Sequence, residues 1–311
     1  MQEALSASRA PYVPRRPSSS QRVTLRGLAH HVLTWGDARA PKLFLLHGWM
    51  DVAASFQFLV DALAGEWHVI APDLRGFGRS EWSPQGYWFA DYIADVDALL
   101  EHFSPDAAVN IVGHSLGGNV VLHYAGVRPQ RVSKVVSLEG FGIPAEDASL
   151  APVKLAKWLD ALRAGTGFAD YADLEGVASR LMKNNPRLSA DKARFLANEW
   201  AAIGPDGRAR LRSDPRHKLP FPTVYRMEEV HAVWREIRAP TLWIAALQSH
   251  IPKWLDDHPE GEGAPETLSG VRRRIGHIAG ATLVTIPDAG HMLHHDQPQA
   301  VARAIETFLL H

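Results

Sequence analysis

The chain has 311 residues, 46% of them hydrophobic and 22% charged, which is enough for a large buried core. The 33 basic and 34 acidic side chains give a formal net charge of -1, so composition gives no support for binding nucleic acid or an anionic membrane. Cysteine is absent, which excludes disulfides, thiolate catalysis and cysteine-bound metals, and no apolar run reaches the roughly 18 residues that span a bilayer.

Residues 1–21 have the composition of a tail. The stretch SASRAPYVPRRPSSSQ (6–21) is rich in Pro, Ser and Arg and contains no apolar run that could be buried. A transit peptide has a similar composition, but the prolines oppose the amphipathic helix that such a peptide forms. We therefore expect a disordered tail over residues 1–21.

Strand-like and helix-like segments then alternate. Residues 22–36 have the pattern of two strands around a glycine turn, which is typical of an antiparallel hairpin. Short apolar runs follow, at residues 42–48, 68–74, 109–115 and 132–140. Between them, helical periodicity covers 91–103 and 117–127. Apolar runs that alternate with helices indicate a parallel sheet covered by helices on both faces.

The alternation stops after Phe141. Residues 143–237 are helical and rich in loops, without a notable strand-like run. Two strand-like runs and a closing helix-like segment then follow, at 240–246, 281–287 and 299–310. We therefore expect one α/β core over residues 22–142 and 238–311, interrupted by a helical cap over 143–237.

A G-x-S-x-G motif lies at a strand-to-helix junction in the middle of the expected sheet, over residues 113–117. Ligands of parallel sheets bind beyond the carboxyl ends of the strands, where this junction lies. Glycines beside Ser115 allow the strand and the helix to approach closely, and the N–H groups of the helix face any negative charge that develops. A small residue can also serve packing alone, but we interpret Ser115 as a nucleophile.

These segments together resemble the α/β-hydrolase superfamily with a helical cap. The matching segments, in the superfamily's usual order, are LFLLHGWMD (43–51), PDLRGFGRS (72–80), GHSLGG (113–118) and DAGHMLHHDQPQAV (288–301). Within the cap, RLMKNNPRLS (180–189) is similar to the serine hydrolase-like branch. The resemblance implies an α/β-hydrolase fold, a mostly parallel sheet with helices on both faces and an inserted helical cap.

An oxyanion hole is implied by the same resemblance. A carbonyl under attack develops a negative oxygen that needs donors about 3 Å away. The backbone N–H groups of Leu116, next to the nucleophile, and of Trp49, on the loop after the first parallel strand, would supply them. His47 and Gly48 would hold this loop close to the serine; the alternative is that both are plain turn residues.

The base is expected among 16 histidines. A serine hydroxyl is barely nucleophilic near pH 7 and needs a base. His291 follows a glycine on the loop after the last strand, from which it could reach across the sheet to Ser115; His294 is the main alternative. His114 projects from the other side of the bend, so we expect it to pack beneath the cap or to contact substrate.

The acid departs from the common superfamily pattern. The segment in which that pattern has an aspartate reads AALQSHIP (245–252), with Gln248 and Ser249 at the expected position. Glu139 ends the preceding strand, the position used by some capped relatives, notably a group of haloalkane dehalogenases. We expect Glu139 to orient His291. There are three alternatives: Asp256 or Asp257 reaches back to the histidine, the site has no acid, or Glu139 pairs with a cap arginine.

Other signals concern substrate and cofactors. Aromatic residues near the site loops and in the cap can line an apolar pocket, although each one taken singly is more often part of the core. We expect substrate contacts from His47, His114, Phe141 and Trp158. The pairs His30-His31 and His294-His295 have no acid at metal-ligand spacing, so we expect no metal, and nothing indicates a cofactor.

We therefore expect a serine hydrolase, carboxylesterase-like, that cleaves small-to-medium carboxylic esters through an acyl-enzyme on Ser115. Carbon–carbon bond hydrolysis by the same triad and a non-enzymatic ligand-binding homologue are the alternatives. The expected partner is a small-molecule ester, without nucleic acid or membrane. We expect a soluble, cytoplasmic monomer or homodimer.

Overall fold

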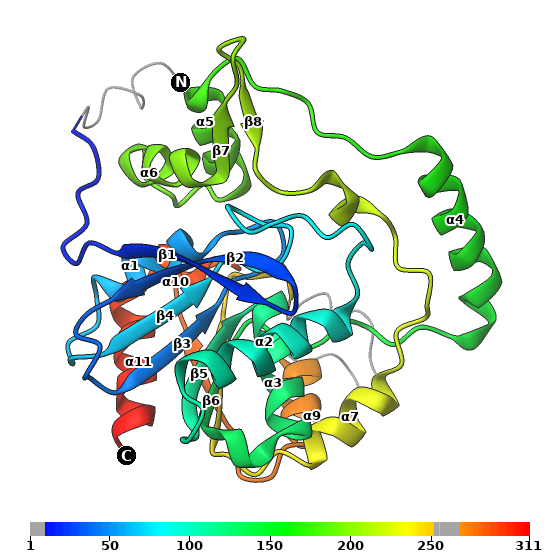
Figure 1. Cartoon of the computed structure of the whole chain (residues 1–311). Coiled ribbons are helices and arrows are strands. Elements are labelled where there is room, and N and C mark those ends of the chain that lie inside the picture. The colour runs from blue at the N-terminus through cyan, green and yellow to red at the C-terminus, as the bar shows by residue number, and fades with distance from the viewer. Residues whose placement is uncertain (1–9, 252–254, 256–267) are drawn as a thin grey trace.

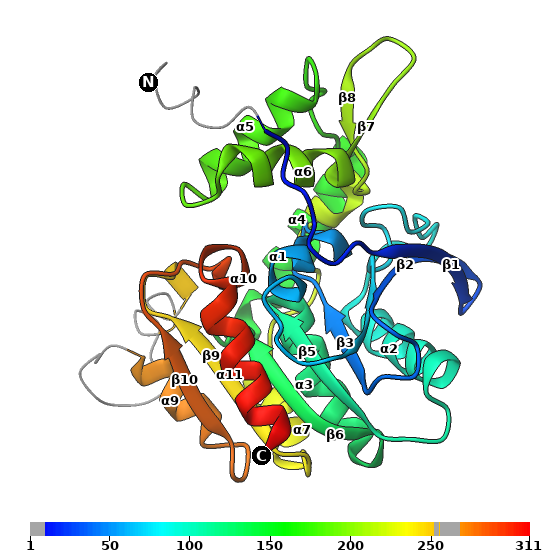
Figure 2. The ribbon, with the colours of Figure 1, turned by 90° about the vertical axis from the view of Figure 1, so that its left-hand side faces the viewer.

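The computed structural model describes residues 10–251, Leu255 and residues 268–311. Eight strands form one sheet in the order β1-β2-β4-β3-β5-β6-β9-β10 (Figures 1 and 2). They are β1 (Ser19–Leu25), β2 (Leu28–Trp35), β3 (Lys42–Leu46), β4 (His68–Pro72), β5 (Val109–His114), β6 (Val132–Leu138), β9 (Thr241–Ala246) and β10 (Thr282–Ile286). β2 pairs antiparallel with β1 and β4, and the other five neighbouring pairs are parallel. The predicted mostly parallel sheet is confirmed.

Helices cover both faces of this sheet, as the alternating pattern predicted. One face packs against α2 (Phe89–Phe103), α3 (Leu116–Val127), α7 (Met227–Arg235) and α9 (Ser269–Ile275). The other packs against α1 (Gln57–Val60), α10 (Leu293–Asp296) and α11 (Pro298–Leu310). Short 3-10 helices, η2 (Ala53–Phe56), η3 (Pro129–Arg131), η4 (Ala148–Leu150) and η5 (Pro215–Lys218), lie in the connections.

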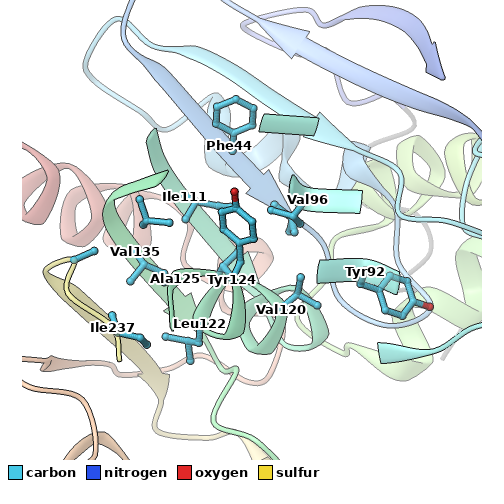
Figure 3. Close-up of a cluster of buried hydrophobic side chains, with 14 of the residues drawn as sticks. Phe44, Tyr92, Val96, Ile111, Val120, Leu122, Tyr124, Ala125, Val135 and Ile237 are labelled. Atoms are coloured by element: carbon cyan, nitrogen blue, oxygen red, sulfur yellow. The ribbon is translucent and has the colours of Figure 1, made fainter. Parts of the chain in front are cut away.

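The core explains why the central strands are apolar throughout. Phe44 of β3, Ile111 of β5 and Val135 of β6 are fully buried against the helices of one face (Figure 3). In α2, Tyr92 and Val96 are four residues apart and therefore face the same side of the helix, toward this cluster. Burying a large apolar side chain contributes about 1.5–3 kcal/mol, so the two faces together fix the sheet to which the site residues are attached.

Between β6 and β9 the chain leaves the sheet. It forms α4 (Ala151–Ala164), α5 (Leu174–Asn184), α6 (Ala190–Trp200) and a short antiparallel pair, β7 (Ala201–Ile203) with β8 (Ala209–Leu211). The β7–β8 pair was not predicted, because three residues are too few to show an alternating pattern. α5, α6 and the pair lie together over the end of the sheet, whereas α4 extends to one side (Figures 1 and 2).

The cap has its own apolar cluster. Val177 and Leu181 of α5 pack with Leu196 of α6 and with Phe58, which belongs to α1 of the core. α4 contributes no buried residue, and its Leu155, Leu159 and Leu162 are each nearly half exposed. The cap is therefore held on the core through α5 and α6.

The predicted disordered tail is wrong for residues 10–21. Strand β1 begins at Ser19, because its residues pair in register with β2. Further upstream, Tyr12 packs edge-on against Phe58, with 4.9 Å between ring centroids, and the Tyr12 hydroxyl donates to Asp61. The Arg16 N–H also donates to Asp61, at 2.8 Å. The contacts of Tyr12 with Phe58 and of two groups with Asp61 thus order a segment whose composition is that of a coil. Residues 1–9 lie outside the described part.

Within the described ranges, no helix is both long and apolar enough to cross a bilayer.

Candidate active site

Ser115 occupies a strained turn between β5 and α3. Its backbone has φ 52° and ψ -112°, a conformation that costs a non-glycine residue on the order of 1–3 kcal/mol. A Cβ atom on Gly113 would lie 2.2 Å from the carbonyl oxygen of Gly117, and a Cβ on Gly117 would lie 2.2 Å from that of Leu46. The two motif glycines are therefore required by close backbone approach, and the Ser115 side chain is left at the surface of a cleft.

His291 lies directly opposite this serine. It follows Gly290 on the loop after β10, and its Nε2 atom lies 3.0 Å from Ser115 Oγ. His294, the alternative base, is fully buried beside His114, with 4.5 Å between ring centroids, and neither of its ring nitrogens has a hydrogen-bond partner among the described residues. Of the two histidines, the structure brings His291 to the serine.

Glu139 completes the chain of polar groups. It directly follows β6 in a left-handed conformation, φ 57°, and its Oε2 atom lies 3.3 Å from His291 Nδ1. The backbone N–H of Ala246 donates to Oε1 at 2.7 Å, and the Ser249 hydroxyl donates to Oε2. The Glu139 side chain is fully buried, so these donors compensate the loss of water around the carboxylate. Asp256 and Asp257 lie outside the described residues.

The loop after β3 packs against the serine turn. A Cβ atom on Gly48 would lie 3.0 Å from His114 Nδ1 and 3.2 Å from Ser115 Cβ, so glycine permits this approach. Trp49 follows on the same loop and lines the cleft with about half of its side chain exposed, and Leu116 is the first residue of α3. Their roles as oxyanion donors stay a prediction.

The cleft above Ser115 has a volume of about 750 Å³ and lies between the core loops and the cap. Its cap wall contains apolar side chains, Val177, Leu181, Leu188, Leu196 and Trp200. A volume of this size is typical of sites that enclose small organic ligands.

Of the four predicted substrate contacts, the structure brings His114 to this cleft. Its Nε2 atom lies 2.8 Å from the backbone oxygen of His291, to which the ring N–H donates. This bond holds the His291 loop over the nucleophile turn and leaves His114 Nδ1 as an acceptor.

His47, Phe141 and Trp158 are not among the residues that line the cleft in the described part of the chain. His47 is buried, with Nε2 accepting from the Leu74 N–H at 2.9 Å and Nδ1 donating to the Gly48 oxygen at 2.7 Å, so it joins two loops. Phe141 is buried against Trp243 in the core, and Trp158 lies on the outlying helix α4. The structure does not bring these three side chains to the cleft. The sequence could not separate them from cleft residues, because buried loop joints and core aromatics have the same residue types as pocket walls.

A second polar cluster lies beside the triad. Asp51, His114 and His294 have atoms of the kind that bind metals within 4.8 Å of one another. The sequence did not predict this cluster, because the three residues are far apart in the chain. Burial raises the pKa of Asp51 to about 7 and lowers the pKa values of His114 and His294 well below the ordinary histidine value. These shifts favour the uncharged form of all three groups. The expectation of no bound metal stays a prediction.

Comparisons with known proteins identify the family of the fold. The model of the family described as alpha/beta hydrolase fold matches residues 41–298. The chain is 27% identical to a serine hydrolase-like protein of Danio rerio, over 88% of this chain and 83% of that protein. It is 28% identical to a 3-hydroxybutyrate-oligomer hydrolase of Cupriavidus necator, over 91% and 93%. A solved structure of a hypothetical protein from Pseudomonas aeruginosa is similar with a TM-score of 0.80 and 26% identity, over 94% and 99%.

Proposed function

This chain belongs to the alpha/beta hydrolase fold family, and from that premise we propose that it is a serine hydrolase that cleaves small-to-medium carboxylic esters through an acyl-enzyme on Ser115. The observation that carries the proposal is the continuous contact from Ser115 Oγ to His291 Nε2, 3.0 Å, and from His291 Nδ1 to Glu139 Oε2, 3.3 Å. Relatives named as hydrolases support the same class of reaction.

Acylation follows from these positions. Ser115 Oγ attacks the ester carbonyl carbon while His291 Nε2 takes the hydroxyl proton, and the carbonyl electron pair moves to its oxygen. Glu139 holds Nδ1–H toward itself and stabilises the imidazolium. As the tetrahedral intermediate collapses, His291 returns the proton to the alcohol, which leaves.

Deacylation repeats the sequence with water. His291 removes a proton from a water molecule, whose oxygen attacks the acyl carbon, and then protonates Ser115 Oγ as the acid is released. The backbone N–H groups of Leu116 and Trp49 are proposed to donate to the oxyanion in both steps. The position of Leu116 at the start of α3 supports this role, because the N-terminal N–H groups of a helix have no partner within the helix.

The cleft supports a substrate of limited size. Its volume of about 750 Å³ suits a small or medium ester, and the cap above it opposes entry of a long polymer.

Hydrolysis of p-nitrophenyl acetate, butyrate and octanoate tests the proposal. We expect turnover by the wild type and loss of at least about 10³-fold in kcat for Ser115→Ala. Ser133→Ala is the matched control, because Ser133 is exposed near the start of β6, at the opposite end of that strand from Glu139. Equal rates in the wild type and Ser115→Ala would contradict the proposal.

A further inference from the structure

The charged side chains around the cleft are mainly basic. Arg180, Arg187 and Lys218 line it, and among the described residues the acid that lines it is Asp51. Because burial raises the pKa of Asp51 to about 7, this carboxyl contributes at most part of a negative charge at neutral pH. The cleft of a chain with net charge -1 is therefore locally cationic.

Arg187 stands next to the catalytic machinery although it belongs to the cap. Its Nη1 atom lies 3.2 Å from the point that a Cβ on Gly290 would occupy, and Gly290 directly precedes His291. Its Nη2 donates to the side-chain oxygen of Gln248, and the Gln248 amide donates to Asp288 at 3.1 Å. The guanidinium is thus held at the rim of the triad by a neutral amide, and it has further N–H groups to offer.

None of these three cations is neutralised by an acidic side chain of the described residues, although Lys218 Nζ lies over the Phe168 ring, 5.2 Å from its centroid. No ion pair within 4.0 Å joins any of them to an acid in the described ranges, and Lys218 Nζ instead donates to the Gly167 oxygen at 3.0 Å. Some other arginines of the cap are paired, such as Arg194 with Glu175 at 2.9 Å and Arg210 with Asp206 at 2.6 Å. Three cations without an acidic partner that converge on one cleft favour an anionic ligand.

We propose that the substrate is an ester that also carries a carboxylate, and that Arg187 binds this carboxylate, with Arg180 and Lys218 adding to the attraction. The inference rests on the proposed function, because it takes Ser115 as the site of acyl transfer. A planar carboxylate matches the paired N–H donors of a guanidinium. Binding it at Arg187, beside the His291 loop, would hold the ester carbonyl over Ser115.

The test compares an ester that carries a free carboxylate, mono-p-nitrophenyl glutarate, with its neutral methyl ester, methyl p-nitrophenyl glutarate. The succinate and adipate pairs vary the spacing. We expect the wild type to prefer the charged ester by at least about tenfold in kcat/KM, the value of one charge-assisted hydrogen bond. The preference should fall with added salt, because salt screens exposed charges. It should fall toward one in Arg187→Gln and partly in Arg187→Lys.

Lys183→Gln is the matched control, because Lys183 is exposed on the same helix as Arg180 but does not line the cleft. It should keep the wild-type preference. A preference that survives in the triple variant Arg180→Gln, Arg187→Gln, Lys218→Gln would overturn the assignment, as would equal rates for both esters in every spacing.

The inference and the proposed function can fail separately. Turnover of both esters that depends on Ser115 but ignores the charge overturns the carboxylate inference alone. Where turnover is slow, protection of Ser115 from a fluorophosphonate by glutarate, but not by neutral glutaramide, tests binding directly. Protection by neither compound, or by both equally, overturns the inference, whereas absence of any Ser115 labelling overturns the proposed function.

Discussion

Glu139 and His291 come from loops 152 positions apart in the chain, and their Oε2 and Nδ1 atoms lie 3.3 Å apart. Ser249 lies where the common family pattern has its acid, and its hydroxyl donates to Glu139 instead. Strands β6 and β9 are parallel neighbours, with Leu138 beside Ile244, so their carboxyl ends are adjacent. An acid on either end can therefore approach the same imidazole.

Glu139→Gln should lower kcat for p-nitrophenyl butyrate by about 10²-fold or more, because a neutral amide neither stabilises the imidazolium nor fixes its tautomer. Ser249→Ala should have a smaller effect, since Ala246 N–H still donates to the carboxylate. Moving the acid tests the same relationship. The double variant that combines Glu139→Gly with Ser249→Asp should recover part of the rate that Glu139→Gly alone loses. No recovery would show that the two strand ends are not equivalent.

Two glycines should respond differently to alanine. A Cβ on Gly117 meets the Leu46 backbone at 2.2 Å, so Gly117→Ala should destabilise the fold by more than about 3 kcal/mol. A Cβ on Gly48 meets side-chain atoms of His114 and Ser115 at 3.0 and 3.2 Å, so Gly48→Ala should keep the fold and lower kcat. Thermal unfolding and esterase assays measure both. A wild-type melting temperature in Gly117→Ala would mean that the serine turn is looser than described.

Buried histidines should make the fold sensitive to acid. Burial lowers the pKa of His217 to about 4 and that of His295 to about 3, against 6.5 in the unfolded chain. Below pH 6.5 these histidines therefore bind protons in the unfolded chain but stay neutral in the folded protein. The free energy of unfolding should fall from pH 6.5 toward pH 4 by on the order of 3 kcal/mol for each histidine. His217→Phe keeps the stacking on Phe77 and Tyr87, and its melting temperature should depend less on pH.

Asp51 should act in the opposite direction. Burial raises its pKa from 3.8 to about 7, so the folded protein holds a proton that the unfolded chain releases between about pH 4 and 7, and this contribution to stability is lost as pH rises. Asp51→Asn should be more stable than the wild type at pH 8 by a few kcal/mol, with a smaller difference at pH 5. Chemical denaturation at the two pH values measures this. Asp106→Asn, on the surface, should show neither effect.

Much of the fold and the chemistry was predictable because it depends on local patterns. Apolar runs that alternate with helical periodicity predicted the parallel sheet, and a serine between glycines at a strand end predicted the turn that the structure contains. Glu139 was predictable for a physical reason, since an acid that ends a buried strand needs a partner. The structure supplies three, His291, Ala246 and Ser249.

Features that depend on contacts between distant segments were not predictable. Residues 10–21 are ordered because Tyr12 contacts Phe58 and Asp61, and no local sequence pattern predicts this contact. The residues around Arg187 in the sequence are typical of an ordinary surface segment. Its position beside Gly290 depends on how the cap lies on the core, which the sequence pattern does not predict. Phe141 was misassigned because a strand-end aromatic can face either the cleft or the core.

The central claim is that Ser115 is a nucleophile activated by His291. Intact-mass analysis after incubation with a fluorophosphonate tests it most directly. The claim predicts one probe added to each wild-type chain, located on Ser115, no addition to Ser115→Ala, and much slower addition to His291→Ala. A folded wild type that stays unlabelled, or labelling of Ser115 at the same rate without the imidazole, would contradict it.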